Sequence, residues 1–168
     1  PNNFTYSRAI VKSAMIWDEI EKAGLPGVKG VWCHEAGAGR LFNVIAIKQL
    51  YAGHAKQSAL LASNCHAGNY AGRWTIVVDE DIDPTSMFDV IWAMSTRCDP
   101  PKDIDYIRGA WSTPLDTMLE GPPYENNRAI VDACRPWGRK DTFPTVAEAS
   151  PELKEKMHQK YKELFSAL

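Results

Sequence analysis

The sequence has no excess charge of either sign: 19 Lys and Arg stand against 21 Asp and Glu in 168 residues, for a formal net charge of −2. A chain with that balance lacks the basic surface that binds nucleic acid or anionic membranes. No apolar run approaches the roughly 18 residues needed to span a bilayer, and the start shows no signal-peptide pattern. We therefore expect no nucleic-acid partner and no membrane span.

Cysteine is scarce and scattered. None of the four cysteines forms a C-x-x-C pair, so their spacing disfavours both a zinc site and a disulfide framework. Four reduced thiols are the simpler interpretation, and the cytoplasm is the expected compartment. The cysteines are Cys33, Cys65, Cys98 and Cys134.

The signatures of several enzyme classes are also missing. There is no P-loop, no H-E-x-x-H, no dinucleotide fingerprint, and no spacing that suggests a Ser/His/Asp or Cys/His relay. Residues 36–40 (AGAGR) are followed by LFNVIAI, an expected strand, whereas a phosphate-binding glycine loop needs a helix at that point. A hairpin turn is therefore favoured over a phosphate cradle.

The strongest local pattern runs through residues 73–103. The apolar, β-branched run 74–78 (WTIVV) predicts a buried strand. The acidic cluster 79–83 interrupts it, and Pro84 suits the first turn of a helix. Pro100 and Pro101 end that helix. One face of the helix is predicted from Met87, Val90, Ile91 and Met94.

The whole chain is predicted to be one α/β domain of 1–168, a layered fold with a mixed sheet flanked by helices. Its parts are a first helical segment 1–26, an α/β core 27–149 and a C-terminal helix 150–168. Loops are expected at 64–72 and 111–123. The other expected elements are helices 7–23 and 53–63, strands 27–35, 41–47 and 104–107, and a strand or turn at 128–133.

Both outer helices are predicted to be amphipathic. The first has a stripe of Ile10, Ala14, Trp17 and Ile20, with Lys12 on the opposite, polar face. Ser150 and Pro151 form a good helix start for the last one. Its stripe can pack on a partner subunit or on the domain's own core. That stripe consists of Leu153, Met157, Tyr161, Leu164 and Phe165.

The acidic cluster is the first candidate for chemistry. Carboxylates in a D-x-D-x-D run can bind Ca²⁺ or Mg²⁺, but the EF-hand pattern fails because Pro84 follows and the distant glutamate is missing. Capping of the helix that starts near Thr85 is the favoured interpretation. The cluster comprises Asp79, Glu80, Asp81 and Asp83.

The histidines give weaker signals. His54 and Lys56 share the start of a helix, where they could bind an anion, although a solvated or paired lysine is the simpler interpretation. His34 and His158 suggest no ligand site. His66 and Asn69, in the loop before the central strand, are better placed to meet a small ligand, or else they make ordinary loop hydrogen bonds.

Two stretches of the chain resemble a known family. VVDEDIDP (77–84) followed by DVIWAMSTRCDPPKD (89–103) is similar to the signature of the C-terminal domain of UbiD-type decarboxylases. Upstream, IAIKQLYAGHAKQSA (45–59) resembles the family's strand, YxGHAK turn and helix. These enzymes use prenylated FMN to decarboxylate, and sometimes carboxylate, aromatic and α,β-unsaturated acids.

The resemblance implies that prenylated FMN and a divalent metal, usually Mn²⁺, with K⁺ nearby, are held mostly by an N-terminal domain. The family's catalytic Glu-Arg-Glu network also precedes the matched domain, and this chain has no counterpart of it. Because Pro1 falls where the family's linker enters the C-terminal domain, we expect a C-terminal portion of a longer decarboxylase that is inactive alone. The expected partners are the N-terminal FMN-binding domain, further copies of the chain in a dimer or hexamer, and an aromatic, phenolic acid substrate.

The resemblance also carries over to single positions. Arg97 matches the arginine whose backbone carbonyl helps to bind K⁺ beside the cofactor. Ala67 stands near the place of a lysine that contacts the cofactor phosphate in some relatives, so His66 or Asn69 is expected to replace that contact. The residues that match the wall of the family's substrate pocket are Ala71, Thr113 and Leu115.

Two other functions stay open. The chain could be a stand-alone module for oligomerisation, without catalysis, in which case removal of residues 150–168 should abolish self-association. It could also be a metal-dependent phosphotransfer domain built on Asp79 and Asp81, which predicts stabilisation by Mg²⁺ that is lost in Asp81→Asn.

Overall fold

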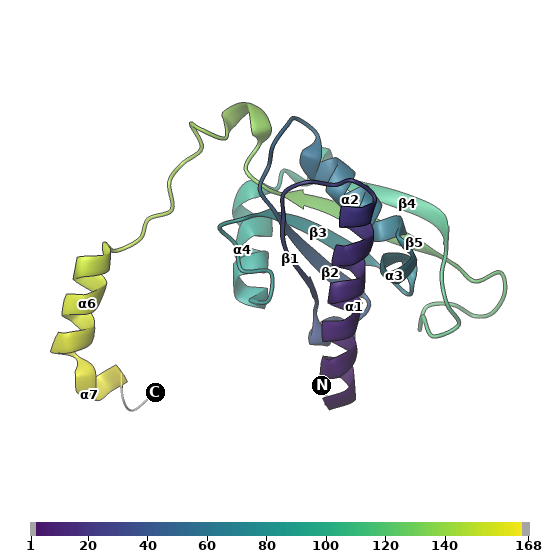
Figure 1. The fold of residues 1–168 in the computed structure, drawn as a ribbon, viewed down its shortest axis with the longest axis horizontal. Coiled ribbons are helices and arrows are strands. Elements are labelled where there is room, and N and C mark those ends of the chain that lie inside the picture. Colours follow the sequence, from purple (N-terminus) through teal and green to yellow (C-terminus); the bar gives the residue numbers. More distant parts are fainter. Residues whose placement is uncertain (1–2, 166–168) are drawn as a thin grey trace.

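The computed structural model describes residues 3–165, which form a five-stranded mixed sheet with helices on both faces (Figure 1). The strands are β1 (Val28–Cys33), β2 (Phe42–Ile47), β3 (Trp74–Asp79), β4 (Ile104–Trp111) and β5 (Glu125–Ala133). The α-helices are α1 (Asn3–Lys22), α2 (His54–Asn64), α3 (His66–Asn69), α4 (Met87–Arg97), α5 (Pro100–Asp103), α6 (Pro151–Lys160) and α7 (Lys162–Phe165). Two short 3₁₀ helices are η1 (Glu35–Gly37) and η2 (Trp137–Arg139).

The sheet has the order β1-β2-β3-β5-β4. The three central strands β2, β3 and β5 are parallel, and the edge strands β1 and β4 are antiparallel to their neighbours. Parallel strands are stable where both faces are covered, and residues 75–79 of β3 are all buried. The α/β class with a mixed sheet, predicted from the sequence, is confirmed.

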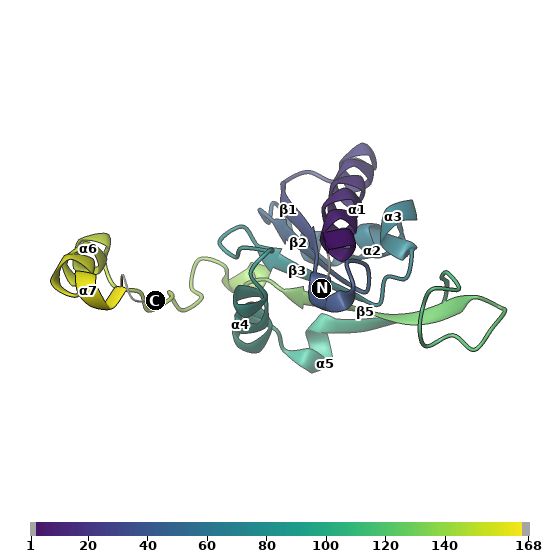
Figure 2. The same ribbon diagram turned by 90° about the horizontal axis from the view of Figure 1, so that it is seen from below.

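Helices cover the two faces of the sheet unequally. Helices α1, α2 and α3 lie on one face and α4 lies on the other (Figure 2). On the first face the core includes Ile16, Ile45 and Val77, and on the second Val90 packs with Ile76. Alternate residues of β3 thus supply both cores, as the two-residue period of a strand requires.

The predicted stripe of α1 is wrong in part. Ile20 is buried as expected, but Ile10 is 46% exposed and Ala14 is exposed, whereas Lys12 is only 7% exposed. The reason is a close contact with strand β1: the backbone N–H of Cys33 donates to Oγ of Ser13 at 2.9 Å. Because of this contact, helix α1 turns its small residues toward the sheet, and Lys12 is buried on the same face. The buried face consists of Ala9, Lys12, Ser13, Ile16 and Ile20.

The segment 64–72, predicted as a loop, contains the short helix α3. Sγ of Cys65 caps it by accepting from the N–H of Gly68 at 3.3 Å. A Cβ at Gly68 would lie 1.7 Å from the carbonyl oxygen of Ala62, so only glycine allows this tight packing against α2. Ala71 then turns the chain toward β3 with a φ of +58°.

The C-terminal segment stands apart from the sheet domain (Figures 1 and 2). The predicted helix start is confirmed, because Oγ of Ser150 accepts from the N–H of Leu153 at 3.2 Å and Pro151 opens the helix. The prediction of a single helix over 150–168 is wrong, since α6 ends at Lys160 and α7 starts at Lys162. The predicted stripe is exposed at Leu153, Met157 and Tyr161; the side chains of Leu164 and Phe165 lie outside the described residues.

Candidate functional site

A buried cluster of charges closes the carboxyl end of β3. Asp79, 1% exposed, accepts from Nε2 of Gln49 at 2.7 Å and from Nη1 of Arg97 at 2.9 Å. The backbone N–H of Arg135 donates to the same carboxylate at 2.7 Å. Two further bonds, at 2.9 and 2.8 Å, join the guanidinium of Arg97 to Asp81. The cluster therefore ties the end of α4 to the acidic turn and to the chain after β5.

This arrangement corrects the prediction that the acidic cluster caps a helix near Thr85. Of these carboxylates, only that of Asp83 bonds to Thr85: it accepts from the N–H and from Oγ1 of Thr85, at 2.8 Å each. Helix α4 itself is capped by Ser86. Asp79 and Asp81 pair with Arg97 instead, and hydrogen bonds from Arg97 are the main reason that the pKa of Asp81 lies below its usual value.

The described residues contain no group of three or more His, Cys, Asp or Glu side chains that could hold a metal ion. Because Asp79 and Asp81 are bonded to a guanidinium, their oxygens do not form the open carboxylate site that Mg²⁺ requires. The phosphotransfer hypothesis built on these two residues gains no support from the structure.

The predicted K⁺ contact is the backbone carbonyl of Arg97. This residue is the last of α4, and the last four carbonyls of a helix have no donor within the helix. That end also carries the negative pole of the helix dipole. A carbonyl of this kind can serve as one oxygen ligand of a cation, while the side chain of Arg97 bonds to Asp79 and Asp81.

A second buried arginine joins three separate segments. The guanidinium of Arg128, on β5, is 2% exposed and donates to the carbonyl of Ser63 at 2.5 Å and to that of Asn69 at 3.1 Å. It also bonds to the carbonyl of Trp111 and, through Nε, to Oδ1 of Asn126 at 2.8 Å. Arg128 thus holds the end of α2, helix α3 and the end of β4 in one arrangement.

Asp116 continues this network beside Arg128. It is 1% exposed, forms an ion pair with Arg73 and accepts from Nδ2 of Asn126 at 3.0 Å. The same Nδ2 lies 3.2 Å from the carbonyl oxygen of Gly72. The segment 112–116 is therefore fixed against the chain that enters β3.

The structure brings the three predicted pocket residues to this network but does not expose them equally. Ala71 is fully buried and Thr113 is 4% exposed, whereas Leu115 is 52% exposed. Thr113 shapes the turn that presents Leu115, since its Oγ1 accepts from the N–H of Leu115 at 3.4 Å and its carbonyl accepts from Asp116 at 3.0 Å. Of the three, Leu115 is the side chain available to a ligand.

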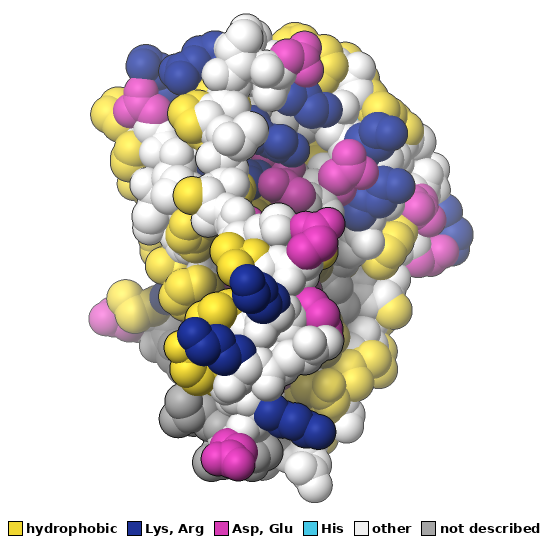
Figure 3. Space-filling view, turned by 90° about the vertical axis from the view of Figure 1, so that its left-hand side faces the viewer, with side chains coloured by type: hydrophobic (Ala, Val, Ile, Leu, Met, Phe, Trp, Pro, Cys, Tyr) yellow, Lys and Arg dark blue, Asp and Glu magenta, His cyan; other side chains and the backbone are white. Residues whose placement is uncertain are grey.

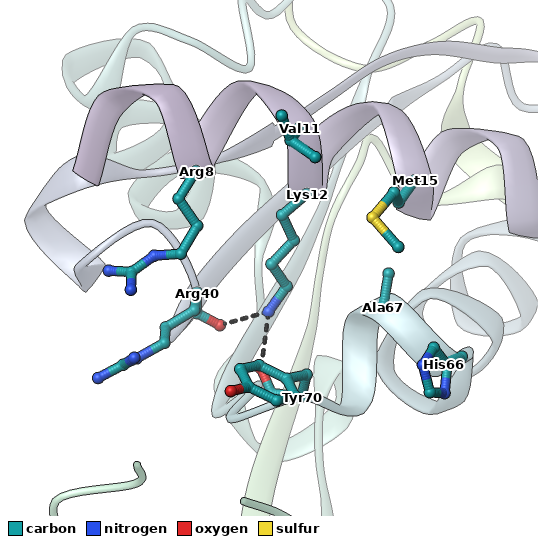
Figure 4. A pocket seen from close by; sticks show the side chains of 8 residues that line it. All are labelled: Arg8, Val11, Lys12, Met15, Arg40, His66, Ala67 and Tyr70. Carbon is teal, nitrogen blue, oxygen red and sulfur yellow. Dashed lines mark hydrogen bonds between the residues drawn. The ribbon is translucent and has the colours of Figure 1, made fainter. Parts of the chain in front are cut away.

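A pocket of about 220 Å³ opens between α1 and α3 (Figure 4). Its apolar lining comes from Val11, Met15, Ala67 and Tyr70, and its basic lining comes from Arg8, Lys12, Arg40 and His66. Nζ of Lys12 lies at its base, where it donates to the carbonyls of Arg40 and Tyr70 at 2.9 Å each. Burial lowers the pKa of Lys12 to about 8.

The two predicted cofactor contacts lie in different surroundings. His66 is exposed and lines this pocket, whereas Asn69 does not; Asn69 is half-buried, and its Oδ1 has no hydrogen-bond partner. Sequence reasoning missed Lys12 and Arg128. Lys12 gives a signal in retrospect, because it lies about one helical turn from both Ala9 and Ile16, which are buried on α1.

The buried lysine predicts an unusual pH dependence of stability. Between pH 8 and 10.5 the folded chain has lost the Lys12 proton that the unfolded chain still holds, so the unfolded state binds more protons and stability rises with pH. We expect a gain of about 1.4 kcal/mol in unfolding free energy between pH 7 and 9, absent in Lys12→Met.

Urea unfolding of both proteins at pH 7, 8 and 9 measures this difference. Burial raises the pKa of Cys33 and of Cys65 to about 11, which opposes the gain above pH 9. Those contributions are shared by the two proteins and largely cancel in the comparison. Parallel stability curves for wild type and Lys12→Met would contradict a depressed pKa at Lys12.

Comparison with known families identifies the family to which the chain belongs. The model of the family described as the 3-octaprenyl-4-hydroxybenzoate carboxy-lyase C-terminal domain (UbiD_C) matches residues 5–133. The chain belongs to this family. The resemblance to UbiD-type decarboxylases seen in the sequence is thereby confirmed, and the match covers the whole sheet, helix α1 from its third residue, and helices α2 to α5.

Curated relatives of this UbiD domain are decarboxylases. The phenolic acid decarboxylase of Sedimentibacter hydroxybenzoicus is 31% identical over 134 residues, which is 78% of this chain and 26% of the relative. The gallate decarboxylase of Lactiplantibacillus plantarum is 30% identical over 138 residues, 74% of this chain and 27% of the relative. The chain thus spans about a quarter of the length of these proteins.

Solved structures of UbiD-class enzymes share the fold. The S. hydroxybenzoicus vanillic acid decarboxylase in its open form has a TM-score of 0.79 and 29% identity, covering 97% of this chain and 34% of that one. HmfF from Pelotomaculum thermopropionicum, a UbiD-class enzyme in complex with FMN, has a TM-score of 0.74 and 24% identity, covering 87% of this chain and 31% of that one. In the part of the chain that the structure describes, no helix is long and apolar enough to cross a membrane.

Proposed function

We propose that this chain is the C-terminal domain of a cytoplasmic UbiD-type carboxy-lyase that decarboxylates, or carboxylates, a phenolic acid. The observation that carries the proposal is the family match over residues 5–133, together with relatives named phenolic acid and gallate decarboxylases. The chain covers only a quarter of those relatives, so the activity belongs to a larger assembly that includes an N-terminal, FMN-binding domain.

In this proposal the domain contributes one wall of the substrate pocket. Leu115 is its contact with the aromatic ring, and Ala71 and Thr113 set the position of that side chain from behind. Arg128 and Asp116 keep the wall rigid, which holds a substrate in a reactive orientation and excludes water. Trp111, Leu115 and Met118 are each more than half exposed, an apolar surface of the kind that a neighbouring domain covers.

Prenylated FMN, when bound, supplies the electron sink for loss of CO₂. This chain's contribution to the cofactor site is small: His66 and Asn69 would help to hold the cofactor, and the backbone carbonyl of Arg97 would help to hold K⁺. Mn²⁺ is assigned to the N-terminal domain, as the family resemblance implies. The carboxylates that transfer protons in the reaction are assigned to that domain as well.

The experiment that tests the proposal is reconstitution from two parts. The chain and its cognate N-terminal domain, loaded with prenylated FMN, K⁺ and Mn²⁺, are assayed separately and mixed, with 4-hydroxybenzoate, vanillate and gallate followed by absorbance. We expect turnover only in the mixture. Leu115→Asp should abolish it, because a buried charge against the ring is costly, whereas Leu60→Asp, an exposed change on α2, should not. Turnover by either part alone, or no turnover by parts that associate, would contradict the proposal.

A second candidate function, self-association, is supported by the C-terminal segment. Leu153 and Met157 are exposed on one side of α6, and the exposed Tyr161 directly follows this helix. Hydrophobic side chains are visible on the side of the molecule where this segment lies (Figure 3). Together with the 111–118 surface, this stripe supports assembly as a dimer or hexamer.

Removal of residues 150–168 is expected to convert that oligomer to a monomer. Burial of the apolar stripe against a partner favours association, and the shortened chain lacks this stripe. Analytical ultracentrifugation of the full and shortened chains measures the change. The doubly substituted Leu153→Asp/Met157→Asp chain should also be monomeric, and Gln159→Asp, an exposed change on the same helix, is the control. An oligomer of unchanged mass after truncation would refute the role of α6.

A further inference from the structure

Helix α6 does not pack on the sheet domain of its own chain. All ten of its residues are exposed, and it lies apart from the sheet in both ribbon views (Figures 1 and 2). A helix of this length is only marginally stable alone in water, and helices in proteins gain most of their stability by packing an apolar face. The apolar stripe of α6, Leu153 and Met157, therefore calls for a docking surface elsewhere in the assembly.

Lysines flank this stripe. Lys156 and Lys160 each follow one of the two stripe residues by three positions, so they lie beside the stripe on the same face of the helix. The acids of α6 lie off that face. Glu155 is two residues from both stripe residues, which places it on the opposite side, and Glu152 precedes the stripe in the first turn. The face that α6 presents to a partner is thus apolar and basic.

Helix α4 keeps an apolar face in solvent after packing on the sheet. Val90 contributes to the core from its inner side. On the outer side, Ile91 and Trp92 follow Phe88 by three and four positions and share its face. Phe88 is 80% exposed and Ile91 is 48% exposed. A row of large apolar side chains of this kind marks an interaction surface more often than a single exposed one does.

A groove of about 480 Å³ lies beside this face, lined by Phe88, Trp92 and Asp89 among others. Arg97 also lines the groove, but its guanidinium is bonded to two carboxylates of the buried cluster. Within residues 3–165 no ion pair joins Asp89 to a basic side chain. Residues 74–96 contain no lysine or arginine. The surroundings of the α4 face are therefore acidic, the opposite of those of the α6 stripe.

We propose that α6 of a second copy of this chain docks on α4, with its stripe against Phe88 and Trp92 and its lysines beside Asp89. An amphipathic helix that lays its apolar face in a groove is a recurring mode of recognition, and opposite charges around the contact set partner and register. The inference rests on the self-association proposed above and adds the surface that receives α6.

The position of α6 in its own chain favours a second copy as the source of the docked helix. Residues 143–147 line a pocket together with Trp92 and Thr96, so the arm that carries α6 starts alongside α4. The arm then continues away from the domain (Figure 1). Two identical chains can exchange such arms reciprocally, which places each α6 on the partner's α4 and closes the assembly as a dimer.

Sedimentation equilibrium of the full chain tests the α4 face. We expect Phe88→Asp to weaken self-association at least about 30-fold, because an aromatic anchor is among the costliest interface residues to replace. Phe4→Asp is the matched control. It changes a phenylalanine on α1 that is 69% exposed, and it should associate as wild type does.

Exchange of charge between two variants distinguishes a second copy from the chain's own α6. Asp89→Lys places a cation at the α4 face, and Lys156→Glu/Lys160→Glu places anions on α6. Each variant alone should associate at least about tenfold more weakly than wild type, because like charges then meet. In an equal mixture every α4 face meets the opposite charge on the partner's α6, so we expect dimers with one chain of each kind. Their formation also shows that both variants are folded.

The results separate this inference from the self-association on which it rests. Wild-type association by Phe88→Asp, together with loss of association on removal of residues 150–168, would overturn the α4 site and leave self-association through α6 standing. A wild-type chain that stays monomeric would overturn both. Charge-reversed variants that stay monomeric when mixed would overturn the exchange of α6 between copies.

Discussion

Replacement of Arg97 by methionine is expected to lower the free energy of unfolding by about 3–5 kcal/mol, because it removes one partner of a buried ion pair and leaves the other uncompensated. The carboxylate left without this partner belongs to Asp79, which is buried, with only 1% of its surface exposed to solvent. Gln49 and Arg135 remain as donors, yet the acidic turn loses its link to α4 through Asp81.

Urea unfolding followed by circular dichroism measures this loss. Lys102→Met is the matched control, since Lys102 forms an ion pair with Asp99 in which both side chains are more than half exposed, and such pairs add little stability. The double variant Arg97→Met/Asp79→Asn should recover part of the loss because the unpaired charge is gone. An Arg97→Met protein as stable as the Lys102→Met control would show that the cluster does not hold the fold together.

The second large effect is expected for Arg128→Met. The substitution leaves the carbonyls of Ser63, Asn69 and Trp111 without their donor. Each buried group left unsatisfied costs about 1–3 kcal/mol, so we expect a loss of at least about 3 kcal/mol. The damage should be largest in the segments that Arg128 joins, 63–72 and 111–116.

Hydrogen exchange distinguishes this local effect from general destabilisation. In wild type the N–H of Ser112 donates to the carbonyl of Tyr124 at 2.8 Å, and in Arg128→Met its exchange should accelerate more than that of β2 amides. Arg128→Lys keeps the charge but not the fork of donors, so it should rescue little. Arg108→Met, an exposed change on the neighbouring strand β4, is the control. Uniform acceleration across the sheet would contradict a specific role in positioning the 111–116 segment.

Much of the fold follows from local patterns. The central strand β3 was predictable because Ile76, Val77 and Val78 form an unbroken apolar run, which is typical of a parallel strand covered on both faces. The start of α6 was predictable because Ser150 and Pro151 supply a cap and a first turn by themselves. In both cases the information lies within a few residues.

The charged residues of the interior were not predictable in this way. Arg128 bonds to carbonyls 65, 59 and 17 residues away, and the acceptors are backbone atoms that leave no trace in the sequence. Lys12 was placed on the polar face because a charge normally marks a solvated position. For Arg97 a signal did exist, since it continues the buried face of Val90 and Ala93 on α4.

In the proposed enzyme, the 111–116 turn forms part of the wall around the substrate ring. The most direct test of this role is the structure of the chain associated with its N-terminal domain, prenylated FMN and a bound phenolic acid. We expect side-chain atoms of Leu115 to lie within contact distance of the ring, about 4–4.5 Å. A ring separated from Leu115 by other residues would contradict it.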